Sequence, residues 1–305
     1  MIIDAHTHTP KYKSTIPPDE VLHHTVWRPD RPVKVPVNWD EYMDTRETVD
    51  KSIVFGIAEL APESPSSDEP EGTRAWTTAF GLDDETSGNV NDATAEFVEA
   101  YPDQLIGFLS IRPQDPGCLE EIERCVSDLN LRGIKLGPNY QNFDPLGDEA
   151  TRVYALAQEL GLPIVFHAGT SPVQLATLDY AHPRHFDQVA TVFPDLRMVM
   201  AHMGHPWFAT TIAVIRKHPN LYADVSALFI RPWSFYNCMR LAEEWGVLDK
   251  LLFGSDYPLS TPAETAHGLR NVNRILEGTH LPRVSEEAME EIIHRDSLGL
   301  LGLAD

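Results

Sequence analysis

Short apolar runs alternate with amphipathic segments along the chain. The runs are rich in Ile, Val, Leu and Phe and do not alternate in polarity; they cover residues 2–5, 52–57, 105–111, 133–136, 163–166, 197–201, 221–225 and 251–253. Such runs are typical of parallel strands that are buried on both faces. Apolar residues recur at helical spacing in segments 91–100, 117–129, 148–160, 207–217 and 235–246. The pattern therefore predicts repeated strand–helix units and a parallel sheet.

Eight such units indicate a closed barrel rather than an open sheet. An open doubly wound sheet is expected to carry a glycine-rich phosphate loop after its first strand, and this sequence has none there. The length of 305 residues suits one barrel of about 250 residues with insertions. We predict an α/β fold, a (β/α)8 TIM barrel formed by a single domain over residues 1–305, with insertions after the first and second strands at about 9–48 and 59–90.

Charge and cysteine content narrow the partners and the compartment. The net charge of −22 disfavours nucleic acid and anionic membranes as partners, which leaves a small-molecule substrate. The three cysteines form no C-x-x-C pair and are expected to be reduced thiols. No apolar run approaches the length of a membrane span, and the first residues read as a strand rather than a secretion signal. We therefore expect a cytoplasmic protein.

The first apolar run continues into Asp4-Ala5-His6-Thr7-His8. Residues two apart on a strand face the same side, so His6 and His8 are expected to point together into the barrel. Two neighbouring neutral imidazoles bind zinc, iron and similar divalent cations. Taken alone, the motif is equally compatible with two solvated histidines at a strand end.

Three later strands end in polar residues of the same kind. The fifth run is followed by His167, the sixth by His202 and the eighth by Asp256. Active sites of this fold lie at the carboxyl ends of the strands, so all these side chains are expected to meet at one mouth. Each one singly is as compatible with a hydrogen-bonded strand end. Together they indicate a shared metal ion, because a buried charge or imidazole needs a partner.

Six motifs relate the chain to a known family: AHTH at 5–8, RGIKLGPNYQNFDP at 132–145, LGLPIVFHAGTS at 160–171, MAHMGHPW at 200–207, HPNLYADVS at 218–226 and FGSDYP at 253–258. Over nearly its whole length the chain resembles the amidohydrolase superfamily. The resemblance is strongest to the amidohydrolase-2 family of metal-dependent enzymes, which includes aminocarboxymuconate-semialdehyde decarboxylase and γ-resorcylate decarboxylase. In combination these motifs are specific for the superfamily, and they are much less specific for the reaction.

The resemblance implies a role for each strand-end residue. His6, His8, His167 and Asp256 match metal ligands, and Asp256 also matches the group that transfers protons. His202 matches a residue that forms a catalytic hydrogen bond in single-metal relatives and binds the second ion in two-metal relatives.

Lys135, on the fourth strand, bears on the number of ions. It matches a carboxylated lysine that bridges the ions of two-metal members; uncarboxylated, it would hold a substrate carboxylate or pair with an acid. The resemblance favours one divalent ion over two. Zinc is the first choice, and manganese and iron are alternatives.

Three further residues are candidates for substrate binding. His205 follows the sixth strand, Arg112 ends the third apolar run, and Arg231 lies in the loop after the seventh. Guanidinium groups bind carboxylates through two parallel hydrogen bonds. The alternatives are a polar residue at a helix start for His205 and structural or surface positions for the two arginines.

Hydrolysis of a small-molecule amide, lactone or ester is the favoured function. Metal-activated water would attack the substrate, with Asp256 as proton shuttle and His202 hydrogen-bonded to the oxyanion. The alternative is non-oxidative decarboxylation of an aromatic or unsaturated carboxylic acid at the same metal, with His202 or Asp256 supplying the proton. A barrel without turnover is a third interpretation, which the polar strand ends disfavour. The family resemblance also suggests a homodimer.

Overall fold

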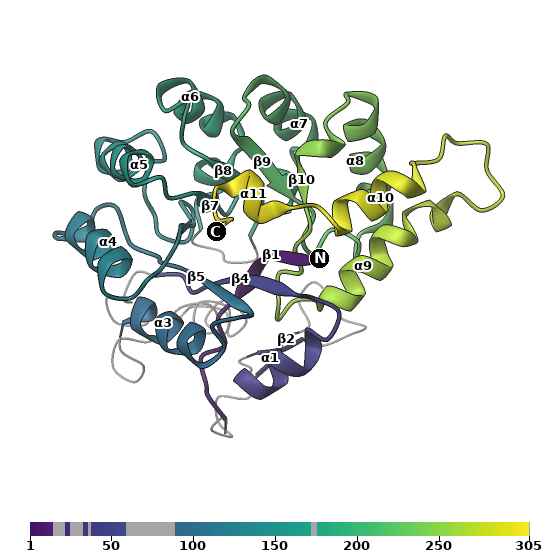
Figure 1. Cartoon of the computed structure of the whole chain (residues 1–305). Helices are drawn as coiled ribbons and strands as arrows, with labels where there is room; N and C mark the ends of the chain where they lie inside the picture. Colours follow the sequence, from purple (N-terminus) through teal and green to yellow (C-terminus); the bar gives the residue numbers. More distant parts are fainter. Residues whose placement is uncertain (15–21, 25–32, 36–37, 59–88, 172–175, 305) are drawn as a thin grey trace.

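A computed structural model describes residues 1–14, 22–24, 33–35, 38–58, 89–171 and 176–304. Within these ranges, eight parallel strands follow one another around a barrel (Figure 1). They are β1 (Ile3–His8), β4 (Lys51–Phe55), β5 (Leu105–Phe108), β6 (Ile134–Leu136), β7 (Ile164–Phe166), β8 (Met198–Met200), β9 (Leu221–Asp224) and β10 (Leu251–Leu252). The predicted strand–helix alternation is confirmed, although most strands are shorter than the apolar runs that indicated them.

Two hydrogen-bonded ladders make up the barrel, one of β1, β4 and β5 and one running from β6 to β10. A parallel bridge between Leu109 and Ile134 joins them at one seam, and a bridge between Thr7 and Tyr257 joins them at the other. The seam between β10 and β1 also contains a backbone hydrogen bond of 2.9 Å from the N–H of Ala5 to the carbonyl of Phe253. The predicted TIM-barrel fold is therefore confirmed.

Helices surround the barrel on the outside, except for α11 (Ser297–Leu301), which lies across one end of the barrel near the two chain termini (Figure 1). The surrounding helices are α3 (Val90–Ala100), α4 (Cys118–Ser127), α5 (Asp148–Leu160), α6 (Arg184–Val192), α7 (Phe208–Lys217), α8 (Pro232–Glu244), α9 (Pro262–Arg270) and α10 (Glu286–Ile293), with short 3-10 helices at Leu178–Ala181, Ala201–Gly204, Leu248–Lys250 and Val272–Leu276. No helix described is long and apolar enough to cross a membrane.

The strands are apolar on both faces because two core layers meet on them. Side chains inside the barrel form one cluster, which includes Ala5, Phe55, Val165 and Leu252. A second and larger cluster lies between the strands and the outer helices. Burying one Leu, Ile or Val contributes roughly 1.5–3 kcal/mol, so these layers hold the strand ends in fixed positions around the mouth.

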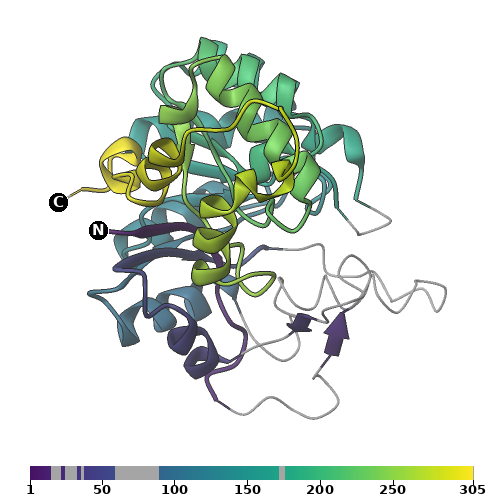
Figure 2. The ribbon, with the colours of Figure 1, turned by 90° about the vertical axis from the view of Figure 1, so that its right-hand side faces the viewer.

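The segment between β1 and β4 has structure of its own. It contains an antiparallel hairpin of β2 (Leu22–His24) and β3 (Val33–Val35) and the helix α1 (Trp39–Thr45). Tyr42 of α1 is buried against Phe97 and Tyr257, with ring centroids 5.7 and 5.0 Å away. Figure 2 shows the hairpin at the end of the molecule away from the two chain termini. The second predicted insertion, 59–90, lies outside the described residues except at its last two positions, where α3 begins.

Candidate metal centre

Strand β1 brings His6 and His8 into the barrel mouth, and both side chains are buried. Asp4, two residues earlier, fixes the strand against the segment after β10. Its carboxylate accepts hydrogen bonds from the backbone N–H and the hydroxyl of Ser255, at 2.9 and 2.6 Å. Burial raises the pKa of Asp4, which the hydrogen bonds from Ser255 counteract in part. The buried contact between Asp4 and Ser255 therefore fixes the strand that carries His6 and His8 against the last strand.

Asp224, at the end of β9, orients His6. One carboxylate oxygen lies 2.8 Å from Nδ1 of His6, and the other accepts the backbone N–H of His202 at 2.9 Å. Burial raises the pKa of Asp224, but the charge and hydrogen bond of His6 outweigh it and leave the pKa below its ordinary value. An ionised Asp224 therefore holds the Nδ1 proton of His6, and Nε2 is the nitrogen left for other partners.

Asp256 lies where the histidines converge. Its Oδ1 is 3.2 Å from Nε2 of His6 and 3.3 Å from Nε2 of His8, and its Oδ2 is 3.9 Å from Nδ1 of His202. Burial acts to raise the pKa of Asp256, yet His202 and the close contacts with His6 and His8 hold it well below its ordinary value. Asp256 and His202 both have left-handed backbones, at φ 61° and 55°. Such strain costs about 1–3 kcal/mol per residue and is concentrated at functional sites.

His167, after β7, completes the cluster from the opposite side. Its ring centroid lies 5.2 Å from that of His202 and 4.6 Å from that of Tyr140. Burial, followed by the charge of His202, lowers the pKa of His167 well below its ordinary value. Its Nε2 is buried and has no hydrogen-bond partner among the residues described. The barrel mouth therefore contains a neutral imidazole whose Nε2 has no partner among the described residues.

These residues fit a divalent cation. The ligand atoms of His6, His202 and Asp256 lie within 4.8 Å of one another, and imidazole nitrogens with one carboxylate suit zinc or manganese. With Nδ1 of His6 bound to Asp224, the Nε2 atoms of His6 and His8 meet the same oxygen of Asp256. A cation between them would satisfy all three acceptors. The predicted set of His6, His8, His167 and Asp256 stays a prediction.

Lys135, on β6, is buried beside this cluster. It is 1% exposed, and its Nζ lies 3.5 Å from Nε2 of His6 and 4.5 Å from the ring centroid of Phe55. Burial lowers the pKa of Lys135 to about 8, although Asp224 and Asp256 act in the opposite direction. A buried amine with a lowered pKa has a larger neutral, reactive fraction than an exposed lysine.

His205 follows His202 by three residues, and Arg231 directly precedes α8. Burial, then the charges of Arg231 and His202, lowers the pKa of His205 to about 4. The loop after β7 packs closely on His205, because a Cβ at Gly169 would lie 2.6 Å from the His205 carbonyl oxygen. The charge of Arg231 therefore acts on His205, which is kept as a neutral imidazole.

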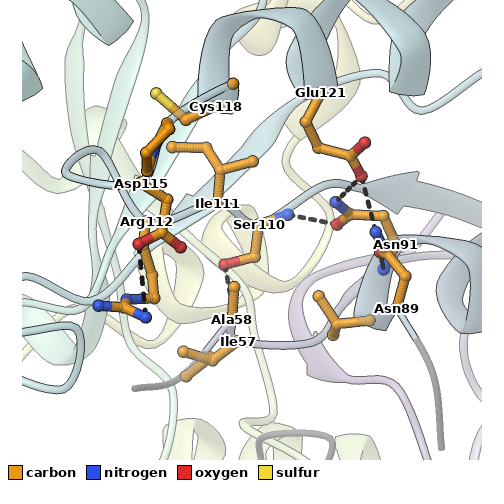
Figure 3. Close-up of a pocket in the computed structure, with 13 residues that line it drawn as sticks. Ile57, Ala58, Asn89, Asn91, Ser110, Ile111, Arg112, Asp115, Cys118 and Glu121 are labelled. Atoms are coloured by element: carbon orange, nitrogen blue, oxygen red, sulfur yellow. Dashed lines mark hydrogen bonds and ion pairs between the residues drawn. The ribbon is translucent and has the colours of Figure 1, made fainter. Parts of the chain in front are cut away.

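Arg112 has different surroundings. It lines a pocket of about 360 Å³ between the ends of β4 and β5 and the starts of α3 and α4 (Figure 3). One guanidinium nitrogen lies 3.4 Å from Asp115, so its charge is partly compensated within the protein. The same pocket contains Glu121, whose pKa falls to about 2 because of its hydrogen bonds with Arg124. Of the two candidate arginines, Arg231 is the one whose charge contributes to the pKa of His205.

Two supporting residues on the β9 side were not among the predicted site residues. Asp224 and Ser226 both lie in the HPNLYADVS motif at 218–226, to which no roles were assigned from the sequence. Both are fully buried. The signal that indicates them is the spacing Asp-x-Ser directly after a buried apolar run, which brings two polar side chains to the barrel mouth.

The fold and the cluster define a class of protein: an α/β barrel with histidines and an aspartate at the carboxyl ends of its strands. The chain matches the amidohydrolase (amidohydrolase-2) family model over residues 3–302. It belongs to that family.

Solved structures share the fold over nearly the whole chain. One is an uncharacterised TIM-barrel protein from Bordetella bronchiseptica (20% identity, 99% of this chain and 98% of that chain, TM-score 0.67). Another is dihydroxybenzoic acid decarboxylase from Polaromonas sp. JS666, with bound manganese and the inhibitor 2-nitroresorcinol (16% identity, 99% and 97%, TM-score 0.60). A third is 5-carboxyvanillate decarboxylase from Sphingomonas paucimobilis (16% identity, 99% of each chain, TM-score 0.58).

Proposed function

We propose that the chain is a metal-dependent, non-oxidative decarboxylase of an aromatic or otherwise unsaturated carboxylic acid. The observation that carries the proposal is the cluster of histidines around Asp256 at the barrel mouth, in which Oδ2 of Asp256 lies 3.9 Å from Nδ1 of His202. Arg231, whose charge adds to the effect of burial on the pKa of His205, would be the group that binds the substrate carboxylate. Two solved structures of the same fold are decarboxylases of aromatic acids, so support for decarboxylation is stronger than for the hydrolysis that the sequence favoured.

His6, His8, His167 and Asp256 would hold the cation, with Asp224 fixing the orientation of His6. A bound divalent cation would polarise the substrate oxygens and neutralise their charge. Zinc suits the histidine-rich set, and manganese is bound in the Polaromonas enzyme. We favour one ion, with His202 left to act on the substrate.

The remaining groups bind the substrate and transfer a proton. Arg231 would bind a carboxylate or phenolate oxygen through its planar guanidinium. His202 would donate a proton to the carbon that bears the carboxylate. The bond to the carboxylate carbon then breaks, its electron pair restores the unsaturated system, and CO2 leaves, so that hydrogen replaces the carboxylate. Water reprotonates His202.

The test loads the purified chain with zinc or manganese and offers dihydroxybenzoic acids, 5-carboxyvanillate, and a neutral lactone or aryl ester. We expect one CO2 for each decarboxylated product and no acid released from the neutral compounds. Acid production from a lactone or ester, without CO2 from any carboxylic acid, would overturn the proposal. Variant Asp256→Asn, which keeps the size of the side chain, provides the background rate.

Hydrolysis remains the second candidate, and Lys135 is the observation that favours it. Its amine lies 3.5 Å from Nε2 of His6, where a carboxylated lysine would reach a second ion, and two ions suit activation of water. Elemental analysis decides: about one equivalent of metal per chain supports the single-ion decarboxylase. Two equivalents, with an added mass of CO2 on Lys135, support the hydrolase.

A further inference from the structure

A chain of hydrogen bonds on the β9 side links two histidines of the centre. Nδ1 of His202 lies 2.8 Å from the hydroxyl oxygen of Ser226, and that oxygen lies 2.5 Å from Oδ1 of Asp224. The other oxygen of Asp224 lies 2.8 Å from Nδ1 of His6. The order is therefore His202, Ser226, Asp224, His6, and Ser226 and Asp224 are both fully buried.

The positions of the protons in this chain follow from counting donors. Asp224 also meets the backbone N–H groups of His202 and Ser226, at 2.9 and 3.1 Å. A carboxylate whose contacts are all hydrogen-bond donors is ionised and has no proton to give. The one hydroxyl hydrogen of Ser226 therefore points at Asp224, and its oxygen is left as an acceptor. Nδ1 of His202 must then be the donor to Ser226.

A second contact leads to the same assignment. Nδ1 of His202 also lies 3.3 Å from the backbone carbonyl oxygen of Ser226. A carbonyl oxygen only accepts hydrogen bonds, so this contact, too, requires a hydrogen on Nδ1. Both oxygen atoms nearest to Nδ1 therefore select the same tautomer of the imidazole.

We propose that Ser226 is a positioning residue that fixes His202 as the Nδ1–H tautomer and thereby confines its proton exchange to Nε2. The proposal rests on the proposed function in one respect, that His202 transfers a proton to the substrate. A histidine held in this way presents the same nitrogen to the substrate in every turnover. Nδ1 is also unavailable to a second metal ion, because its lone pair is replaced by the N–H bond to Ser226.

Nuclear magnetic resonance tests the tautomer without any substrate. The zinc-loaded chain is labelled with ¹⁵N-histidine and its ring nitrogens are correlated with the carbon-bound ring protons at about pH 8, well above the ordinary pKa of histidine. The signals of His202 are those absent from His202→Gln. We expect a protonated Nδ1 and an unprotonated Nε2. A protonated Nε2 in the unmodified chain would overturn the proposal, whether or not a substrate is known.

Variants of Ser226 then test the role of the hydroxyl. In Ser226→Ala only the longer contact, 3.3 Å to the backbone carbonyl, remains to hold the Nδ1 hydrogen of His202, so we expect part of the imidazole to change to the Nε2–H tautomer. We expect unchanged zinc content, unchanged KM and a kcat lowered by about 10–100-fold, the usual effect of losing such a supporting partner. Ser226→Thr, which keeps a hydroxyl, should restore the Nδ1–H tautomer. Ser52→Ala is the matched control, since Ser52 is a buried serine that accepts a hydrogen bond from Arg46 instead. An unchanged tautomer in Ser226→Ala, or an equal loss of kcat in Ser52→Ala, would overturn the role of Ser226.

Discussion

The two sides of the barrel mouth differ in how well their polar groups are satisfied. On the β9 side, Asp224 receives hydrogen bonds from His6, from Ser226 and from the backbone of His202. On the β7 side, Nε2 of His167 is buried without a hydrogen-bond partner among the residues described. Leaving a buried polar atom unsatisfied costs about 1–3 kcal/mol.

This difference suggests two roles: the β9 side, with Asp224, holds the histidines in place, and the β7 side, with His167, is the side open to a ligand. The β9 side is complete within the protein, so it fixes orientation and requires nothing from outside. In the proposed site, a bound cation would supply the partner that His167 lacks.

Asp256 joins the two sides, so its substitution should have the largest effect. Asp256→Asn keeps the shape of the side chain but removes the charge that faces His6, His8 and His202. We expect kcat to fall by about 10²–10⁴-fold, the range of a lost acid–base group, with the fold retained by circular dichroism. Activity within a factor of two of the unmodified chain would show that Asp256 takes no part in the reaction.

Acid should destabilise the metal-free protein through the same histidines. Burial lowers the pKa of His8 to about 4 and lowers those of His167 and His202 below the ordinary value. Between about pH 6.5 and 4 the unfolded chain binds protons at these rings and the folded chain does not, so stability falls as the pH falls.

For His8 alone the loss is roughly 3 kcal/mol, at 1.36 kcal/mol per pKa unit. Urea unfolding of the chelator-treated protein at pH 7 and pH 5 measures the slope, and His8→Gln should reduce it. Equal slopes in the two proteins would show that His8 is not the source.

Asp224→Asn tests the role of the β9 side directly. The amide keeps the size of the side chain but places an uncharged group against Nδ1 of His6 and against Ser226. We expect metal affinity to fall by about 10–100-fold, as for other residues that orient a metal-binding histidine. Competition with a chelating dye measures the dissociation constant. An unchanged constant would mean that His6 does not need Asp224 in order to bind metal.

The sequence indicated the strand ends of the centre but not their partners. His167, His202 and Asp256 each follow a buried apolar run, and a parallel barrel brings such ends to one mouth. The hydrogen bond between His6 and Asp224 joins residues 218 positions apart, and no local pattern indicates which histidine an aspartate on β9 will meet.

Local patterns also found some helices and not others. Helix α5 was predicted with its observed bounds, because Gly161, at φ 70°, ends it in the left-handed conformation. Helix α9 was not predicted, although the sequence contains the residues of a capping box. Thr261 is the N-cap, Pro262 follows it, and the side chain of Glu264 accepts a hydrogen bond from the backbone N–H of Thr261. Its nine residues are too few for hydrophobic periodicity to stand out. The sequence alone could not distinguish Arg112 from Arg231 as the substrate-binding residue, since each follows an apolar run.

Arg112 and Arg231 differ in the charged groups that lie near them. Arg112 lies 3.4 Å from Asp115 in a pocket beside the centre, whereas Arg231 lies near enough to His205 to lower its pKa. Arg231→Lys keeps the charge but loses the planar pair of donors. It should raise KM for a carboxylic acid by about tenfold, the equivalent of 1.4 kcal/mol, with kcat nearly unchanged.

Arg112→Lys, the matched variant, should change KM by less than about twofold, since substitutions away from a site usually stay within 0.5 kcal/mol. If the two variants exchange these effects, the substrate carboxylate binds in the pocket between β4 and β5, and the assignment of Arg231 is wrong.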